Sequence, residues 1–339
     1  MLGTDRQIKP SLEPPDAVVQ LSQSAPIANL LPMVRKLDSE DARAEKLASR
    51  FGYAGGIGVV WLLVAFVVMT GMMDYRAANV LIADVIESIP GLESIDPHAT
   101  AQVIMVVLLV GNVLVAVLFT IAMFVVRRRY KRFDIDDRKL ATVEHLLGVL
   151  TTDVKPTTAV GLVMDFRGYH RPDAKVAGGG FQRKWLSTRL PLVDRSTAEL
   201  SVATHCKRKT RAKNKYTKVK DKLIEELTVE IRPPKGTSFA PDAANRLRQR
   251  FNNISGLRTV RCKVASKAMR VVFRTPPALR IRGRAGWTIS GHERLVDGPR
   301  ALGALMRAHR AMRSVLVAAP RMAPPQGGYP PPGYAQGMR

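Results

Sequence analysis

The chain has 339 residues but contains few cysteines, few aromatic residues and few acidic residues. Its two cysteines, Cys206 and Cys262, are too few for a disulfide framework and lack metal-ligand spacing. It has no GxxxxGK(S/T), GxSxG, HExxH or CxxC pattern and no set of kinase motifs, so the common nucleotide-binding, hydrolase and zinc signatures are missing. We therefore predict no catalytic residue, no cofactor and no metal site, and we favour a protein that is not an enzyme.

Acidic residues are scarce relative to basic ones, since 28 Asp and Glu stand against 53 Lys and Arg, a net charge of +25. This excess indicates an anionic neighbour, which would be lipid head groups, an acidic protein or nucleic acid. A genome biased toward arginine codons would raise the charge without any such partner. Aromatic side chains that stack on bases are almost missing from the Lys-rich segment 206–222, where only Tyr216 lies. We therefore rank nucleic acid below lipid and protein.

Two long runs, residues 51–73 and residues 101–126, contain no charged residue. At about 1.5 Å per helical residue, the first reaches about 35 Å, which is enough to cross a hydrocarbon core of about 30 Å. We predict a two-helix transmembrane hairpin over these ranges. The protein would then be a multi-pass protein of the cell inner (plasma) membrane, with the lipid bilayer as its first partner.

The charges that flank the two runs predict their orientation. A helix predicted over 34–50 brings several bases to the first run, whereas the connection 74–100 has Arg76 as its only base. Because cytoplasmic flanks carry the excess of bases, we predict that 74–100 is a short external loop and that both termini are cytoplasmic. The polybasic segment 127–133 is predicted to contact an anionic surface. Its bases are Arg127, Arg128, Arg129, Lys131 and Arg132.

Small and polar residues inside the two runs are candidates for helix packing. Gly52 and Gly56 form a GxxxG pair in the first run, and Asn112 lies in the middle of the second. Small residues allow close approach of two backbones, and an asparagine hydrogen-bonds across helices. These three residues are predicted to pack the two helices together or to join copies of the protein in a homo-oligomer.

The remaining segments differ in composition. Residues 1–33, rich in Pro, Ser and Gln, and the Pro, Gly and Tyr-rich tail 320–339 are predicted to be disordered. In residues 134–319, apolar residues recur at helical spacing at both ends and alternate with polar residues, as in strands, between them. This pattern predicts a basic cytoplasmic α+β domain with a mainly antiparallel sheet. Its last helix is expected to bury Leu302, Leu305 and Met306.

The Lys-rich segment has the alternation of a β-hairpin. Leu200, Val202 and Thr204 alternate with polar residues before it, and one parity is apolar again after it, so two strands each have an apolar and a charged face. Residues 208–215 would form the turn and its shoulders. The predicted contact residues on the charged side and tip of this hairpin are Lys207, Arg208, Lys209, Arg211, Lys213, Lys215, Lys218, Lys220 and Lys222. The sequence leaves open whether this surface binds a partner or is only solvated.

Three hypotheses of function remain. The first is a non-enzymatic scaffold or regulatory module that contacts anionic lipid or an acidic protein. The second is a subunit of an oligomeric membrane transporter or channel. The third is a membrane-tethered enzyme with an unrecognised site, which would need a pocket that gathers Asp165 and Asp194 with His170 or His205.

Overall fold

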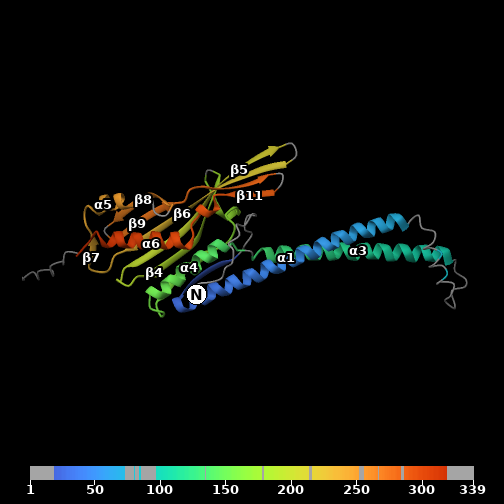
Figure 1. Ribbon diagram of the computed structural model, residues 1–339, viewed down its shortest axis with the longest axis horizontal. Helices are drawn as coiled ribbons and strands as arrows, with labels where there is room; N and C mark the ends of the chain where they lie inside the picture. The colour runs from blue at the N-terminus through green and yellow to red at the C-terminus, as the bar shows by residue number, and fades with distance from the viewer. Residues whose placement is uncertain are drawn as a thin grey trace, which may run out of the picture.

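The computed structural model describes residues 19–72, 80, 84, 97–133, 135–177, 179–213, 216–251, 256–265, 267–283 and 286–318. A pair of long helices projects from one end of a sheet domain, so that the molecule is elongated (Figure 1). The predicted tail 320–339, residues 1–18 and most of the predicted loop 74–100 lie outside the described residues. The mainly antiparallel sheet with packed helices, predicted from the two periodicities, is confirmed.

The two long helices are α1 (Ile27–Met72) and α3 (Pro97–Lys131). By length and composition, Ile27–Ala65 and Val110–Lys131 are helices that could cross a membrane. The helix predicted over 34–50 and the apolar run after it form one uninterrupted helix, which begins within the sheet domain. The sheet domain is therefore joined to the apolar part of α1 by continuous helix rather than by a loop.

Small residues of α1 let α3 approach closely. A Cβ added at Gly52 would lie 3.1 Å from the Arg127 guanidinium, and one at Gly55 would lie 3.5 Å from the Phe124 ring. Gly56, the second residue of the predicted GxxxG pair, has nothing within 4 Å of such a Cβ. The helix pair therefore packs through glycines spaced three residues apart, and Gly56 lies away from the contact.

The sheet has ten strands in the order β1-β2-β4-β5-β6-β10-β11, with β9 pairing both β6 and β8, and β3 pairing β4. Its strands are β1 (Gln20–Pro26), β2 (Ala159–Asp165), β3 (Lys175–Val176), β4 (Gly180–Pro191), β5 (Thr197–Lys213), β6 (Tyr216–Arg232), β8 (Arg258–Ala265), β9 (Ala268–Arg274), β10 (Ala278–Gly283) and β11 (Gly286–Ser290). Residues 219–223 of β6 pair with β10, whereas residues 226–231 pair with β9. The sheet therefore divides along β6 into two branches.

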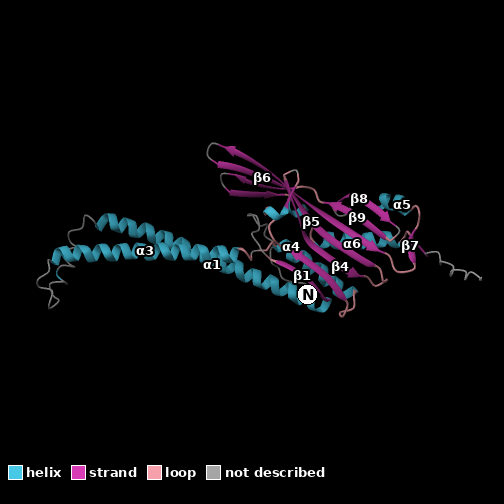
Figure 2. Ribbon diagram, turned by 180° about the vertical axis from the view of Figure 1, so that it is seen from behind, coloured by secondary structure: helices cyan, strands magenta, loops and turns pink. Residues whose placement is uncertain are grey.

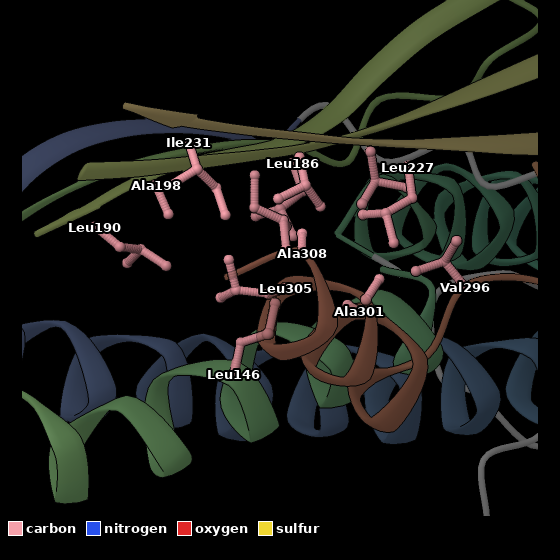
Figure 3. Packing of buried hydrophobic residues seen from close by; sticks show 14 of the residues in the cluster. Leu146, Leu186, Leu190, Ala198, Leu227, Ile231, Val296, Ala301, Leu305 and Ala308 are labelled. Carbon is pink, nitrogen blue, oxygen red and sulfur yellow. The ribbon is translucent and has the colours of Figure 1, made fainter. Parts of the chain in front are cut away.

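Helices cover one face of this sheet. The helices are α4 (Asp137–Asp153), α5 (Ala243–Arg250) and α6 (Gly298–Arg313), with short turns η1 (Pro172–Ala174) and η2 (His292–Arg294), while β7 (Thr237–Phe239) pairs with β12 (Leu316–Ala318). Two aspartates cap these helices, since Asp136 accepts a hydrogen bond from Arg138 N and Asp297 from Arg300 N. The core lies between the sheet and α6 (Figure 3). Sheet residues shown there are Leu186, Leu190, Ala198, Leu227 and Ile231, helix residues are Leu146, Ala301, Leu305 and Ala308, and Val296 comes from the segment before α6.

The last helix packs differently from the prediction. Met306 is 44% exposed, and the buried face of α6 consists mainly of alanines, among them Ala301, Ala304 and Ala308. Small side chains allow the helix to lie close to the sheet. Leu302 is partly buried and packs against the core, whereas Met306 is turned away from it. The prediction for Leu305 is confirmed, because its side chain is buried.

The expected disorder of residues 1–33 is wrong for the part that the structure describes. Residues 20–26 form β1, which pairs with β2 from Gln20 opposite Asp165 to Pro26 opposite Ala159. Ile27, Leu30 and Val34 of α1 belong to the same core as α4 and the sheet. A polar edge strand gains its stability from a partner far away in the sequence, so its own composition does not predict it. The folded unit is thus larger than residues 134–319.

Candidate functional site

The outer half of the β5–β6 hairpin extends beyond the core. Here the basic arm denotes residues 207–213 and 216–222. From Lys209 to Ala212 and from Tyr216 to Lys218, the described side chains are exposed on both faces of the hairpin. The predicted hairpin is confirmed, but its strands continue to Lys213 and Tyr216, so the turn is shorter than predicted. Lys215 lies outside the described residues.

The strand register places basic residues directly opposite one another. Lys207 faces Lys222, Lys209 faces Lys220 and Arg211 faces Lys218, with no acid in any of these pairs. Because alternate residues of a strand point to the same side, all six side chains lie on one face of the arm, and each is exposed. Like charges directly opposite each other in a sheet are destabilising. This face therefore keeps an electrostatic cost that a bound anionic surface would relieve.

Arg208 has a different environment from the other predicted contact residues. On the opposite face of the arm, its Nε and Nη2 donate to the two carboxylate oxygens of Asp221 at 2.7 and 2.8 Å. Asp221 is fully buried, and it also accepts from Tyr169 Oη at 3.4 Å. This charge-assisted pair raises the pKa of the Arg208 guanidinium. Arg208 is thus held by an ion pair at the base of the arm and does not belong to the exposed basic face.

The second predicted basic group ends α3. Arg128, Arg129 and Arg132 are exposed, whereas Arg127 and Lys131 are partly buried. Arg127 packs over Gly52 of α1, as described above. Three bases of the polybasic segment are therefore free of the α1–α3 contact, which places them on the surface where the apolar helices leave the sheet domain.

The basic arm and the apolar helices point toward the same end of the molecule. Figures 1 and 2 show the β5–β6 tip, with β10 and β11 beside it, projecting to the side on which α1 and α3 extend. Two contacts hold this arrangement: Arg35 Nε donates to Glu144 Oε1 at 2.9 Å, and Ile135 N donates to Asp41 Oδ1 at 2.8 Å. They join α1 to α4 and to the chain that follows α3, so the arm has a defined direction relative to the helices.

A buried ion pair joins α4 to the sheet at the base of the arm. Arg138 Nη1 and Nη2 donate to Glu225 Oε2 and Oε1 at 2.9 and 2.7 Å, and both side chains are almost fully buried. Glu225 also accepts from Val296 N at 2.7 Å and from Thr204 Oγ1 at 3.2 Å. Burial alone would lower the pKa of Arg138, but Glu225 and Asp136 outweigh it and raise that pKa. One carboxylate therefore ties together α4, β5, β6 and the segment before α6.

The acid and histidine residues of the enzyme hypothesis separate into two groups. Asp165 accepts from Arg167 and Arg183, with Arg183 Nη1 at 2.8 Å. Asp194 instead bonds to His309 Nε2 at 2.7 Å, a histidine that the sequence did not single out. Among the described residues, no group of three or more metal-ligating side chains could hold a metal ion. Of the two predicted histidines, His205 lies instead beside Glu226, with 3.8 Å between its Nε2 and Oε2 of that acid. The contacts of the described residues therefore divide this set rather than gather it.

Of the three predicted helix-packing residues, only Gly52 lies in the contact between α1 and α3. Asn112 is exposed on α3, and Gly56 is exposed on α1. Both are thus available to a second copy of the chain, which is the other role that the sequence predicted for them.

Sequence reasoning missed Asp221 and Glu225, although the sequence carried a signal for them. Both acids have the same parity in β6 as the buried Leu223, Leu227 and Val229. An acid on the apolar parity of a strand indicates a buried ion pair, because an unpaired carboxylate there would lose its hydration without compensation.

Comparison with protein-family models, with curated proteins and with solved structures finds no match to this chain.

Proposed function

We propose that the protein is a two-pass membrane protein, with both ends in the cytoplasm, whose basic arm docks on the anionic surface of the same membrane. It would act as a non-enzymatic scaffold or regulatory module that holds its sheet domain against that surface. The observation that carries the proposal is the row of three facing pairs of basic residues, on an arm that points to the same side as the apolar helices.

The pairing of β1 with β2 supports the proposed topology. β1 precedes α1, and β2 follows α3, yet their residues pair from 20–26 to 159–165. A sheet cannot pair across a bilayer, so the flanks of the two apolar helices belong on one side of any membrane that they cross. Bases at these flanks favour the cytoplasmic side.

Electrostatics supports lipid as the partner of the arm. Each base near an anionic leaflet contributes on the order of 1 kcal/mol, and the attraction decays over a Debye length of about 8 Å at physiological salt. The exposed bases Arg128, Arg129 and Arg132 add to the same field from the end of α3. Because the arm is anchored to the membrane by its own chain, docking has no cost of bringing two molecules together.

The test uses the full chain in nanodiscs, because β1 and part of α1 belong to the core of the sheet domain. An environment-sensitive label is placed on the arm through Ala212→Cys, in a chain that carries Cys262→Ser. Cys206 needs no replacement, since burial raises the pKa of its thiol to about 12 and keeps it unreactive. We expect the label to be shielded from a water-soluble quencher in anionic nanodiscs, exposed in neutral ones, and exposed again at high salt.

A matched pair of variants separates the arm from total charge. The arm variant replaces Lys207, Lys209 and Arg211 with Gln, and the control replaces three exposed bases of β8, at the other end of the sheet (Figure 1). The control bases are Arg258, Arg261 and Lys263. Only the arm variant is expected to lose shielding. Equal quenching in neutral and anionic nanodiscs would refute docking on lipid and would favour an acidic protein as the partner.

A further inference from the structure

A small cavity lies at the junction of the sheet branches and α4. It has a volume of about 40 Å³, and its lining comes from the start of α4, from β5, β6, β10 and β11, and from η2. Here it is called the junction cavity. Its polar lining includes Asp136, Lys139, Tyr169, Arg280 and His292. It is therefore a polar cavity built by segments that are far apart in the sequence, beneath the base of the basic arm.

Lys139 is the unusual member of this lining. The residue is only 5% exposed, and its ammonium lies 5.5 Å from the centre of the buried Trp185 ring. Among the described residues, the ammonium has no hydrogen bond and no carboxylate within ion-pair distance. Burial lowers the pKa of Lys139, and Asp136 opposes that shift only in part. A largely buried ammonium whose partner is an aromatic ring is costly, since the ring replaces only part of the hydration that burial removes.

The carboxylates near the cavity are already engaged. Glu225 accepts from Arg138 twice, from Val296 N and from Thr204. Asp136 accepts from Arg138 N and caps α4. Burial would raise the pKa of Asp136, but Coulombic attraction from Arg138 and Lys139 outweighs burial and lowers that pKa. The lining has three cationic residues (Arg138, Lys139, Arg280) and two carboxylates (Asp136, Glu225), so the count is one positive charge in excess.

We propose that the junction cavity binds one small oxyanion, with the Lys139 ammonium as its main ligand. An oxyanion would supply the acceptor that Lys139 lacks and would balance the excess charge. Arg280, which donates to Tyr169 Oη at 3.0 Å, and the partly buried His292 lie in the same lining. Burial, followed by the charge of Arg138, lowers the pKa of His292. The ring is thus neutral near pH 7 and serves as one donor and one acceptor.

The size of the cavity selects the class of ligand. At about 15 Å³ of probe volume for each water, 40 Å³ holds about three waters. This matches the three oxygens of one bicarbonate ion, is tight for the four of inorganic phosphate, and excludes a nucleotide. A bound anion would link the first turn of α4 to β10 and η2, and it would therefore fix the base of the arm. Binding of an anion in the junction cavity does not require the arm to dock on lipid.

Two measurements on the full chain in neutral detergent test the proposal. Equilibrium dialysis with labelled inorganic phosphate is expected to give one ion bound per chain. The midpoint of thermal unfolding is expected to rise with the logarithm of phosphate concentration, relative to chloride at equal ionic strength. Bicarbonate and sulfate are compared in the same assay to rank the oxyanions. Nanodiscs with phosphatidic acid and no free phosphate show whether a lipid phosphate replaces the free ion.

The decisive variant is Lys139→Met, which keeps the apolar stem against Trp185 and removes the charge. It is expected to lose the phosphate-dependent rise in midpoint while its midpoint in chloride is equal or higher. Lys263→Met, on exposed β8, is the control and should respond as the wild type does. The proposal is overturned if the wild-type chain binds none of the three ions, or if Lys139→Met responds as strongly as the wild type. Because dialysis uses the wild type alone, it decides the matter even if a variant does not fold.

Discussion

Replacing Glu225 with Leu should destabilise the sheet domain by about 3 kcal/mol. Removing one partner of a buried ion pair typically costs about 3–5 kcal/mol, because the other charge remains buried without compensation. We expect the lower end of that range, since Asp136 Oδ2 lies 3.6 Å from Arg138 Nη2 and still offsets part of its charge. For a domain of this size, about 1 kcal/mol shifts the unfolding midpoint by about 2–4 °C, so the midpoint should fall by about 6–12 °C.

The matched experiment is a double-mutant cycle of Glu225→Leu, Arg138→Met and the pair together. The double variant removes both charges and should recover most of the loss, leaving about 1 kcal/mol for the acceptor that Val296 N and Thr204 no longer have. Thermal unfolding of the full chain in detergent, followed by tryptophan fluorescence, measures each step. If the two single losses simply add in the double variant, the ion pair does not couple α4 to the sheet and the reasoning is refuted.

Three further changes have defined outcomes. Burial would raise the pKa of Asp165, but hydrogen bonds from Arg167 and Arg183 outweigh it and lower the pKa, so the stabilisation is present above about pH 4 and lost as pH falls further. Asp165→Asn should therefore lower the unfolding midpoint at pH 7, and the difference from wild type should vanish at low pH. Ala304→Leu should cost about 1–3 kcal/mol in urea unfolding, because Ala304 is fully buried where α6 lies close to the sheet; an unchanged urea midpoint would mean that the contact is loose. Asn112→Leu should reduce the fraction of crosslinked dimer in lipid, because it removes an exposed polar group from α3; equal crosslinking would exclude this face from self-association.

Local patterns predicted a large part of this fold. The two apolar runs and the period-two strands of β5 and β6 were predictable because each depends on residues that are near one another in the chain. The facing pairs of basic residues in the arm were harder to predict. They depend on the register of two strands, and a shift by one residue would have placed the bases in different pairs.

Lys139 shows why the junction cavity was missed. Lys139 precedes the buried Val143 by four residues and the buried Leu146 by seven, so it lies on the buried face of α4. This spacing was a signal that Lys139 is buried. A lysine in a first turn is nevertheless typical of a solvent-exposed helix start. The cavity itself could not be predicted, because its lining joins four strands, a helix and a short turn only after the sheet has formed.

The position of β1 sets the order in which the protein can be completed. Residues 20–26 leave the ribosome before α1 and α3, but their partner strand, residues 159–165, is made only after both. At about 5–20 residues per second, the early strand waits on the order of ten seconds. During that interval the ladder of hydrogen-bonding groups on residues 20–26 has no intramolecular partner and is open to capture by another chain. The slower the synthesis of residues 27–158, the longer residues 20–26 remain without their partner strand.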